Sequence, residues 1–365
     1  MSPVGENEND ARSKWVDAGP GGRCAGRRFY SVSHPMLTRL LRPSFLPAFF
    51  ALAAATLAGA GAPLTIAVIP KGTTHEYWKS INAGAVKAQR ELAAKGIAVN
   101  LIWRGPLKED DREQQIQVVE NFISQNVSAI VLAPLDDKAL VAPVEEAAGA
   151  KIPVVIIDSG LQTKSFASFV ATDNREGGRI AARELGKMLG GQGNVILLRY
   201  AVGSASTEER EAGFLEIMAK DFPAIKLIST DQHAGATRDT AKTASENLLN
   251  KFGPQVTGVF AANESAASGM LLALRDAGLA GKVKFVAFDS GEMLNDGLQK
   301  GEVDGMVVQN PIRMGYLGVL TAVAAIRGEK FEAHIDTGVG FVTKANFDSP
   351  EMADIVHPPL DKYLK

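Results

Sequence analysis

From residue 64 onward, short apolar runs rich in β-branched residues alternate with longer amphipathic stretches, and this alternation constrains the fold more than any other feature of the sequence. It predicts repeated strand-helix units around parallel sheets, because strands covered on both faces read as continuous apolar runs. The expected strands are residues 64–69, 99–102, 129–133, 153–158, 195–198, 226–229, 258–262, 283–289 and 305–309. We therefore expect an α/β fold with more than one sheet, since nine strands exceed what one small sheet usually holds.

The order of the elements occurs twice, once over residues 64–158 and again over residues 195–289. Both halves end in the same way, with an apolar strand followed by Asp-Ser-Gly, at Asp158 and at Asp289. In open α/β sheets, ligands bind at the carboxyl ends of the strands. We therefore expect two lobes of the α/β class and a ligand site near these two aspartates.

Residues 1–62 are expected to be a disordered extension followed by a signal peptide. Residues 1–35 are rich in glycine, arginine and polar residues, show no apolar period and contain the single cysteine, Cys24. Arg39 and Arg42 then precede an apolar run over residues 45–62 that ends in small residues. This order is typical of a secretory signal peptide, here cleaved near residues 60–62. If translation starts at Met36, residues 1–35 are not part of the product.

A membrane anchor is the alternative for the apolar run of residues 45–62. The run contains Pro47 and is shorter than the ~20 residues of a spanning helix, which favours the signal peptide. No cysteine follows the small residues, so a lipoprotein is not expected. The expected product is a soluble, cysteine-free protein of the periplasm.

The charge of the chain is nearly balanced, with 39 Lys and Arg against 41 Asp and Glu. No overall field attracts nucleic acid or an anionic membrane surface, so we expect no nucleic-acid partner. The length of 365 residues fits a leader and two lobes of ordinary domain size.

The segment after the first strand carries the first group of candidate contacts, with His75, Tyr77 and Trp78 at the start of a long helix. Tyr77 and Trp78 offer flat apolar faces that suit the C–H face of a sugar ring. Trp78 also fits the apolar stripe of its helix, which is the alternative interpretation. The pair His75-Glu76 lacks the i, i+4 spacing of a helical zinc site, and we expect no metal.

Polar side chains at strand ends form the second group. Asp158 and Asp289 can each accept two hydroxyl hydrogen bonds, as a vicinal diol requires, although a strand-end aspartate is also a common helix N-cap. Asn263 can donate and accept at the same sheet edge, again with an N-cap as the alternative. Gln309 ends the last strand, where the chain is expected to change lobes.

Arg210 is expected early in a helix for which Ser206 and Glu209 predict a capping box. Its guanidinium can donate several hydrogen bonds in a fixed geometry. A solvated surface arginine is the alternative.

Five segments carry a resemblance to a known family, and they are residues 66–78, 129–134, 152–158, 259–264 and 285–289. Together with residues 172–174 and 209–214, they resemble the ribose-binding class of periplasmic sugar-binding proteins, which is related to the lactose-repressor family. The resemblance covers residues 64–341. It implies two doubly wound parallel-sheet lobes joined by a three-crossing hinge, the periplasmic binding protein type I fold. The expected lobes are residues 63–172 plus 310–338 and residues 173–309 plus 339–365.

The resemblance also implies roles for individual residues. Tyr77 and Trp78 match the family's aromatic stacking pair. The family's polar ligand contacts match Asp158, Arg210, Asn263, Asp289 and Gln309. The sequence departs from the ribose binders at four places, which are His75-Glu76 in place of Asn and Pro, Ser159 in place of Arg, Ala133 in place of Asn, and Ala236 where a third aromatic is usual. These changes predict a ligand other than ribose, with His75 and Ser159 among the contacts.

The resemblance implies a non-enzymatic, cofactor-free, monomeric substrate-binding component of an ABC transporter, which captures a monosaccharide or polyol and delivers it to a membrane permease. Lys71 is similar to a lysine of relatives that bind autoinducer-2, so a furanosyl signal is the alternative ligand. Docking on a chemoreceptor is a further alternative. A transcription regulator would need an upstream helix-turn-helix, and an enzyme would need a dinucleotide, phosphate-loop or nucleophile motif; the sequence contains none of these.

Overall fold

The computed structural model describes residues 62–365. The expected extension and signal peptide, Ala62 apart, lie outside the described residues. Among the helices of the described part, none combines the length and the apolar character that crossing a membrane requires.

The first lobe contains a six-stranded parallel sheet in the order β11-β5-β4-β3-β1-β2. Its strands are β1 (Leu64–Ile69), β2 (Val99–Trp103), β3 (Ala129–Leu132), β4 (Val154–Ile157), β5 (Ser168–Ala171) and β11 (His334–Asp336). The central strands β3 and β4 are buried along their whole length, as the continuous apolar runs predict.

The second lobe contains another six-stranded sheet, in the order β12-β10-β9-β8-β6-β7. Its strands are β6 (Gly193–Leu198), β7 (Ile225–Ser229), β8 (Gly258–Ala261), β9 (Lys284–Phe288), β10 (Gly305–Gln309) and β12 (Val339–Val342). Only β12 in this sheet is antiparallel, and it pairs with β10. The expected class of two doubly wound α/β lobes is confirmed.

Helices cover both faces of each sheet, and each face has its own apolar core. In the first lobe they are α1 (Glu76–Ala94) and α9 (Pro311–Arg327) on one face, with α2 (Arg112–Ser124) and α3 (Val141–Gly149) on the other. In the second lobe they are α4 (Asn174–Met188) and α5 (Ala205–Asp221) on one face, with α6 (Arg238–Phe252), the 3-10 helix η1 (Gly253–Gln255), α7 (Glu264–Asp276) and α8 (Glu292–Lys300) on the other.

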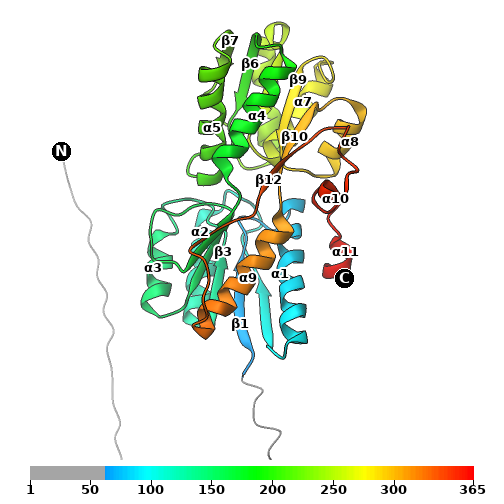
Figure 1. The fold of residues 1–365 in the computed structure, drawn as a ribbon. Coiled ribbons are helices and arrows are strands. Elements are labelled where there is room, and N and C mark those ends of the chain that lie inside the picture. Colours follow the sequence, from blue (N-terminus) through cyan, green and yellow to red (C-terminus); the bar gives the residue numbers. More distant parts are fainter. Residues whose placement is uncertain (1–61) are drawn as a thin grey trace, which may run out of the picture. The chain divides into compact units, whose positions relative to one another are not determined.

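The long helices α1 and α9 lie side by side with their backbones in close approach (Figure 1). A Cβ on Gly84 would overlap the carbonyl oxygen of Ile312, and a Cβ on Gly315 would overlap that of Ile81. Glycine at both positions therefore sets the distance between the helices.

The chain passes between the lobes at three neighbouring places. It leaves β5 for α4 after Ala171, leaves β10 for α9 at Asn310, and leaves β11 for β12 after Asp336. At the second crossing, the Asn310 side chain accepts a hydrogen bond from the Arg313 amide, and Pro311 occupies the first helical turn, where its missing N–H costs nothing. The first and third crossings are joined by the hydroxyls of Thr172 and Thr337, 3.2 Å apart.

The last residues, 347–364, form what we call the C-terminal strap. It contains α10 (Pro350–Val356), which packs on the second lobe, and α11 (Leu360–Leu364), which lies against α1 of the first lobe. Arg90 of α1 donates hydrogen bonds to the carbonyls of Lys362 and Tyr363, at 2.6 and 3.0 Å. The sequence analysis placed residues 339–365 entirely in the second lobe, and it did not predict the contact of α11 with the first lobe.

Nine of the observed strands match the expected ones to within two residues, whereas β5, β11 and β12 were not predicted. These three are only three or four residues long and lie next to the hinge crossings, and β11 is largely exposed. Three or four residues are too few for a clear apolar run or alternation, so the sequence of such a strand carries little signal.

Candidate functional site

Nine of the ten predicted contact residues line one enclosed space between the lobes, which we call the central site. They are Lys71, His75, Tyr77, Trp78, Asp158, Arg210, Asn263, Asp289 and Gln309. All lie in segments that follow strands or begin helices, at the sheet edges that face each other. Only about 30 Å³ is open, because the side chains pair with one another across this space.

Asp158 and Asp289 follow equivalent strands of the two lobes and share an unusual backbone. Their φ angles are 64° and 70°, in the left-handed region that residues other than glycine seldom adopt. Such local strain persists only where the surrounding structure holds it, and it is concentrated at functional sites. Neither residue is the N-cap of the helix that follows it. The N-cap alternative therefore does not describe the two aspartates, and both carboxylates face the central site.

The Asp158 carboxylate is held by two neighbours from its own lobe. The Lys71 ammonium lies 3.1 Å from Oδ2, and the Tyr77 hydroxyl donates to Oδ1 at 2.8 Å. Burial, followed by the charge of Asp158, raises the pKa of Tyr77 well above its usual value, so the hydroxyl remains a donor. Lys71 also donates to the hydroxyls of Ser204 and Ser206 in the second lobe, at 3.2 Å each. This group therefore joins the two lobes.

The Asp289 carboxylate has one close neutral partner and one more distant charged partner. Gln309 donates to Oδ1 at 2.7 Å, and the Arg210 guanidinium lies 3.7 Å from Oδ2. Burial raises the pKa of Asp289 to about 6, against the opposing effects of Arg210 and Gln309. The side-chain oxygen of Gln309 is buried and has no hydrogen-bond partner among the described residues. An unpaired acceptor therefore lies beside the carboxylate.

Arg210 is fixed by its surroundings and is not a solvated surface residue. It is 2% exposed, donates to Asn174 and to the carbonyl of Ala262, and stacks 3.8 Å from the centre of the Phe288 ring. Its helix α5 approaches α4 closely, because a Cβ on Gly178 would overlap the Arg210 carbonyl. The α4–α5 packing thus positions the guanidinium beside Asp289.

The predicted capping box of Ser206 and Glu209 is wrong. Helix α5 begins at Ala205 with Ser204 as N-cap, so Ser206 lies inside the first turn and its hydroxyl accepts from Lys71. The Ser206 amide instead donates to the hydroxyl of Ser159, 3.0 Å away in the other lobe. Ser159 does not line the central site; it caps this helix across the interface.

A third cluster, around Glu109, escaped the sequence analysis. Its carboxylate accepts from Trp78 Nε1 at 2.6 Å and from the Tyr200 hydroxyl at 2.5 Å. His75 Nδ1 lies 3.3 Å from Glu109 and 3.2 Å from Glu264, which belong to different lobes. Burial lowers the pKa of His75, but the Glu264 hydrogen bond and the two carboxylate charges outweigh it, so the pKa is raised above its usual value.

Some of the residues missed by the sequence analysis could have been identified from the sequence, and others could not. Tyr200 and Glu264 stand at carboxyl ends of β6 and β8, where the sheet-edge rule could have found them. Ser204 and Thr207 were within reach of the same rule. Glu109 lies in the loop between β2 and α2, and no local pattern marks it.

Two of the structural alternatives also hold. Trp78 is 3% exposed and packs in the apolar core behind α1, while its ring also lines the central site. Asn263 is the N-cap of α7, where its side chain accepts from the Ala266 amide, and it lines the site as well. In the described part of the chain, no group of three or more His, Asp or Glu residues is arranged to hold a metal ion.

The charges at the central site nearly cancel. Four carboxylates, Asp158, Asp289, Glu109 and Glu264, face Lys71, Arg210 and His75. Arg238 adds a further positive charge 3.5 Å from Glu264. The site can therefore offer many hydrogen bonds to a neutral molecule.

Two doubly wound lobes that enclose a polar site between them, next to a three-crossing hinge, define a ligand-binding protein of the two-lobed type. The family model of the periplasmic binding protein domain matches residues 66–330. The chain belongs to this family.

Its relatives include two curated binding proteins. A D-ribose/D-allose-binding protein of Pseudomonas aeruginosa is 31% identical, over 76% of this chain and 88% of the relative. A xylitol-binding protein of Mycolicibacterium smegmatis is 30% identical, over 72% of this chain and 74% of the relative. Both relatives are named for the sugar or polyol that they bind.

A solved structure is also similar. The carbohydrate transporter solute-binding protein of Agrobacterium radiobacter, in complex with D-arabinose, is 38% identical and has a TM-score of 0.77. The match covers 81% of this chain and 99% of that one. The two-lobed fold is therefore shared along almost the full length of that protein.

Proposed function

We propose that this protein is the periplasmic substrate-binding component of an ABC transporter, which captures a monosaccharide or a related polyol between its lobes and catalyses no reaction. The relatives support the ligand class, since their names specify ribose, allose, xylitol and arabinose. The furanosyl-signal alternative is not favoured, because the names of these relatives specify sugars and a polyol.

The observation that carries the proposal is the pair of strand-end aspartates, one from each lobe, directed into one enclosed space. A polyol presents several adjacent hydroxyl donors, and carboxylates accept two of them at once. The unpaired oxygen of Gln309 offers a further acceptor next to Asp289. Tyr77 and Trp78, with ring centres 5.0 Å apart, add aromatic surface for the C–H face of a ring.

Ligand entry requires the lobes to separate. The open space of about 30 Å³ is far below the roughly 300–1,000 Å³ of ordinary ligand pockets. The contacts that hold it closed are contacts between lobes, such as Tyr200 with Glu109 and His75 with Glu264. Opening therefore frees polar groups of both lobes for the ligand. A sugar bound to the groups that line the central site then favours the closed state, in which the contacts between the lobes form again, by its differential affinity.

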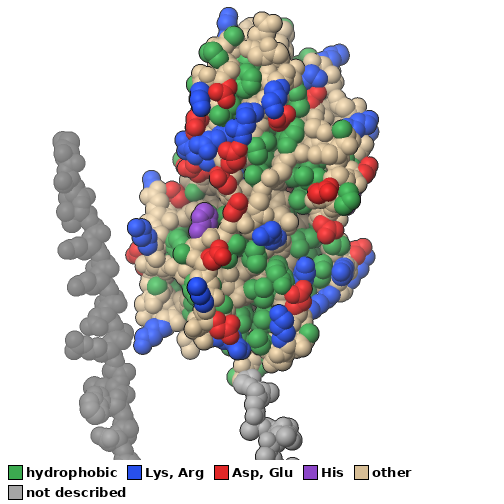
Figure 2. Space-filling view, in the orientation of Figure 1, with side chains coloured by type: hydrophobic (Ala, Val, Ile, Leu, Met, Phe, Trp, Pro, Cys, Tyr) green, Lys and Arg blue, Asp and Glu red, His purple; other side chains and the backbone are tan. Residues whose placement is uncertain are grey.

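The proposal includes the route and the partners of the protein. It is exported by the signal peptide that ends near residues 60–62, acts as a monomer in the periplasm and delivers its ligand to a membrane permease. Docking on a chemoreceptor remains the alternative second partner. Nucleic acid is not proposed as a partner, since basic and acidic side chains are interspersed over the visible face of the molecule (Figure 2).

A thermal-shift screen tests the function. Protein starting at Ala62 is melted with D-ribose, D-allose, D-arabinose and xylitol, and at least one should raise the melting temperature in a saturable way, because binding to the native state stabilises it. The protein recovered with its ligand should contain that ligand chemically unchanged. Stabilisation by amino acids or phosphates alone, or turnover of the sugar, would contradict the proposal.

A further inference from the structure

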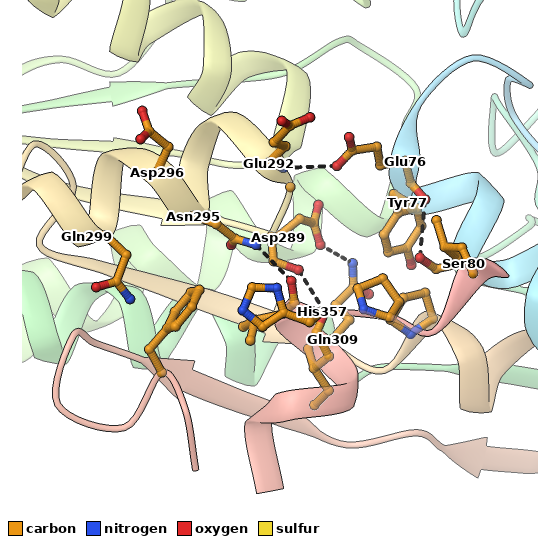
Figure 3. Close-up of a pocket in the computed structure, with 18 residues that line it drawn as sticks. Glu76, Tyr77, Ser80, Asp289, Glu292, Asn295, Asp296, Gln299, Gln309 and His357 are labelled. Carbon is orange, nitrogen blue, oxygen red and sulfur yellow. Dashed lines mark hydrogen bonds between the residues drawn. The ribbon is translucent and has the colours of Figure 1, made fainter. Parts of the chain in front are cut away.

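A second, larger cavity adjoins the central site on one flank of the cleft, and we call it the flank cavity. It encloses about 450 Å³, within the usual range for small-molecule sites. Its walls come from the start of α1, the β9–α8 segment and the C-terminal strap. Tyr77 lies at one end of this space and Gln299 at the other, with Asp289 and Gln309 between them (Figure 3).

The flank cavity and the central site share three residues, Tyr77, Asp289 and Gln309. These are the groups to which the proposed function assigns ring stacking and hydroxyl recognition. A sugar held by Asp289 and Gln309 therefore has one edge toward the flank cavity. Any substituent on that edge would extend into a preformed space rather than against a packed wall.

The far wall of the flank cavity is apolar and is provided by the strap. Phe347, Ile355, Val356, Pro358 and Leu360 line it. The strap is held in place at both ends, since Asn295 donates to the Val356 carbonyl at 2.7 Å and Arg90 binds the carbonyls of α11. This wall offers apolar contact to a ligand but few hydrogen bonds.

The polar groups of the flank cavity exclude anions. The carboxylates of Glu76, Asp289, Glu292 and Asp296 line it, and no Lys or Arg side chain of residues 62–365 does so. The side-chain oxygen of Asn295 is buried without a hydrogen-bond partner within the described chain, which leaves an acceptor at this wall. Donors are also present, from Ser80, Gln299 and His357, but a sugar phosphate or a uronate would meet four carboxylates here and no Lys or Arg.

We propose that the flank cavity binds the apolar aglycone of a small uncharged glycoside whose sugar ring occupies the central site. The ligand class is thereby extended from free monosaccharides to glycosides such as a phenyl glycoside. This inference rests on the proposed sugar-binding function, and its test separates the two. The glycosidic bond stays intact, because binding alone is involved.

The test compares methyl and phenyl glycosides, in both anomers, of D-ribose, D-allose and D-arabinose by isothermal titration calorimetry. The methyl glycoside blocks the same hydroxyl without filling the flank cavity. For at least one sugar, the phenyl glycoside should bind about tenfold more tightly, because an aromatic ring leaves water. The para-carboxyphenyl glycoside should lose this gain, since its charge meets the four carboxylates.

Two matched variants locate the effect. Leu360→Asp places a carboxylate in the strap wall, at the first position of α11, where an acidic residue suits the helix. Leu364→Asp makes the same change on the same helix at an exposed residue that does not line the flank cavity. Leu360→Asp should abolish the phenyl gain and leave the affinity for the free sugar unchanged, whereas Leu364→Asp should alter neither.

The outcomes separate the flank subsite from the sugar-binding function on which it rests. If free sugars bind but phenyl glycosides bind no more tightly than methyl glycosides, the flank subsite is wrong and the receptor function stands. An equal effect of Leu360→Asp and Leu364→Asp would also overturn the subsite, as would equal affinity for the carboxyphenyl glycoside. If no sugar or glycoside binds at all, the proposed function itself fails.

Discussion

The strand ends at Asp158 and Asp289 are built alike but are used differently. Both have a left-handed backbone and a following serine, and both carboxylates reach the central site. Asp158 has a lysine ammonium at 3.1 Å, whereas the nearest partner of Asp289 is the neutral amide of Gln309 and its arginine lies at 3.7 Å. The repeated strand-turn unit therefore fixes where a carboxylate points, and neighbours from other segments determine how firmly it is already paired within the protein.

Alanine at the two aspartates should separate these roles, with the largest effects that we expect. Asp158→Ala leaves the buried Lys71 ammonium without its counter-charge and should lower stability by about 3 kcal/mol, read from chemical denaturation. Asp289→Ala should change stability much less but weaken sugar binding at least tenfold, because a charged hydrogen bond contributes about 1.5–3 kcal/mol. Unchanged affinity in Asp289→Ala would remove this residue from the site.

The glycine contacts of the two lobes provide the next comparison. Gly84→Ala and Gly178→Ala each place a Cβ against a helix backbone, so both should destabilise the fold by about 1–3 kcal/mol. Only Gly178→Ala should also weaken sugar binding, because the backbone that it displaces belongs to Arg210. Gly149→Ala has open space around the new methyl group and is the control, with neutral or slightly raised stability. Equal affinities in the first two variants would contradict the positioning of Arg210 by α4.

The pH dependence of binding should have one limb from each lobe. Asp289, with a pKa of about 6, gains a proton as the pH falls below that value, so affinity should decrease on the acid side. His75 has a raised pKa, so its bridge between Glu109 and Glu264 is present at low pH and is lost as the pH rises through that pKa. Affinity should therefore also decline on the alkaline side. We expect a decrease of roughly threefold, because His75 is partly exposed and solvent weakens its ion pairs with the two glutamates.

Calorimetry between pH 5 and pH 9 checks both limbs. Asp289→Asn should remove the acid limb and His75→Gln the alkaline limb. Glu264→Gln should remove the alkaline limb without lowering affinity at high pH, because it removes the repulsion between Glu109 and Glu264 that a neutral His75 leaves behind. An alkaline limb that persists in His75→Gln would assign it to another group.

The two serines that follow the aspartates should have smaller effects than the aspartates themselves. Ser159 accepts from the Ser206 amide of the other lobe, whereas Ser290 donates to the Ile355 carbonyl of the strap. Ser159→Ala should weaken sugar binding about fivefold, since a lost helix cap costs about 1 kcal/mol and this cap forms only between closed lobes. Ser290→Ala should leave sugar affinity unchanged. Titration of both variants with the same sugar would contradict the comparison if they behaved alike.

One physical reason underlies the predicted fold and the predicted place of the candidate site: a parallel strand buried on both faces must be a continuous apolar run, and its carboxyl end lies at the ligand edge. That reasoning identified Asp158, Asp289 and Gln309. It could not find Glu109, whose role depends on Trp78, His75 and Tyr200 meeting in space.

The errors have the same origin. Ser206 with Glu209 satisfies the local pattern of a capping box, but the helix begins two residues earlier and the cap comes from Ser159 in the other lobe. The contact of α11 with α1 likewise depends on packing across the two lobes, which no local pattern records. Local sequence thus specifies the elements, while contacts between lobes remain visible only in the structure.

A sugar that binds between the lobes should close them, and a distance measured between the lobes reports this closure. Glu146→Cys on α3 and Lys220→Cys on α5 place one fluorophore on each lobe at exposed positions, in a protein starting at Ala62 that has no other cysteine. Energy transfer should rise on addition of the sugar that stabilises the protein, with the dissociation constant found by calorimetry, and Asp289→Ala should shift that midpoint at least tenfold. Binding without any change in energy transfer would contradict closure of the lobes around the ligand.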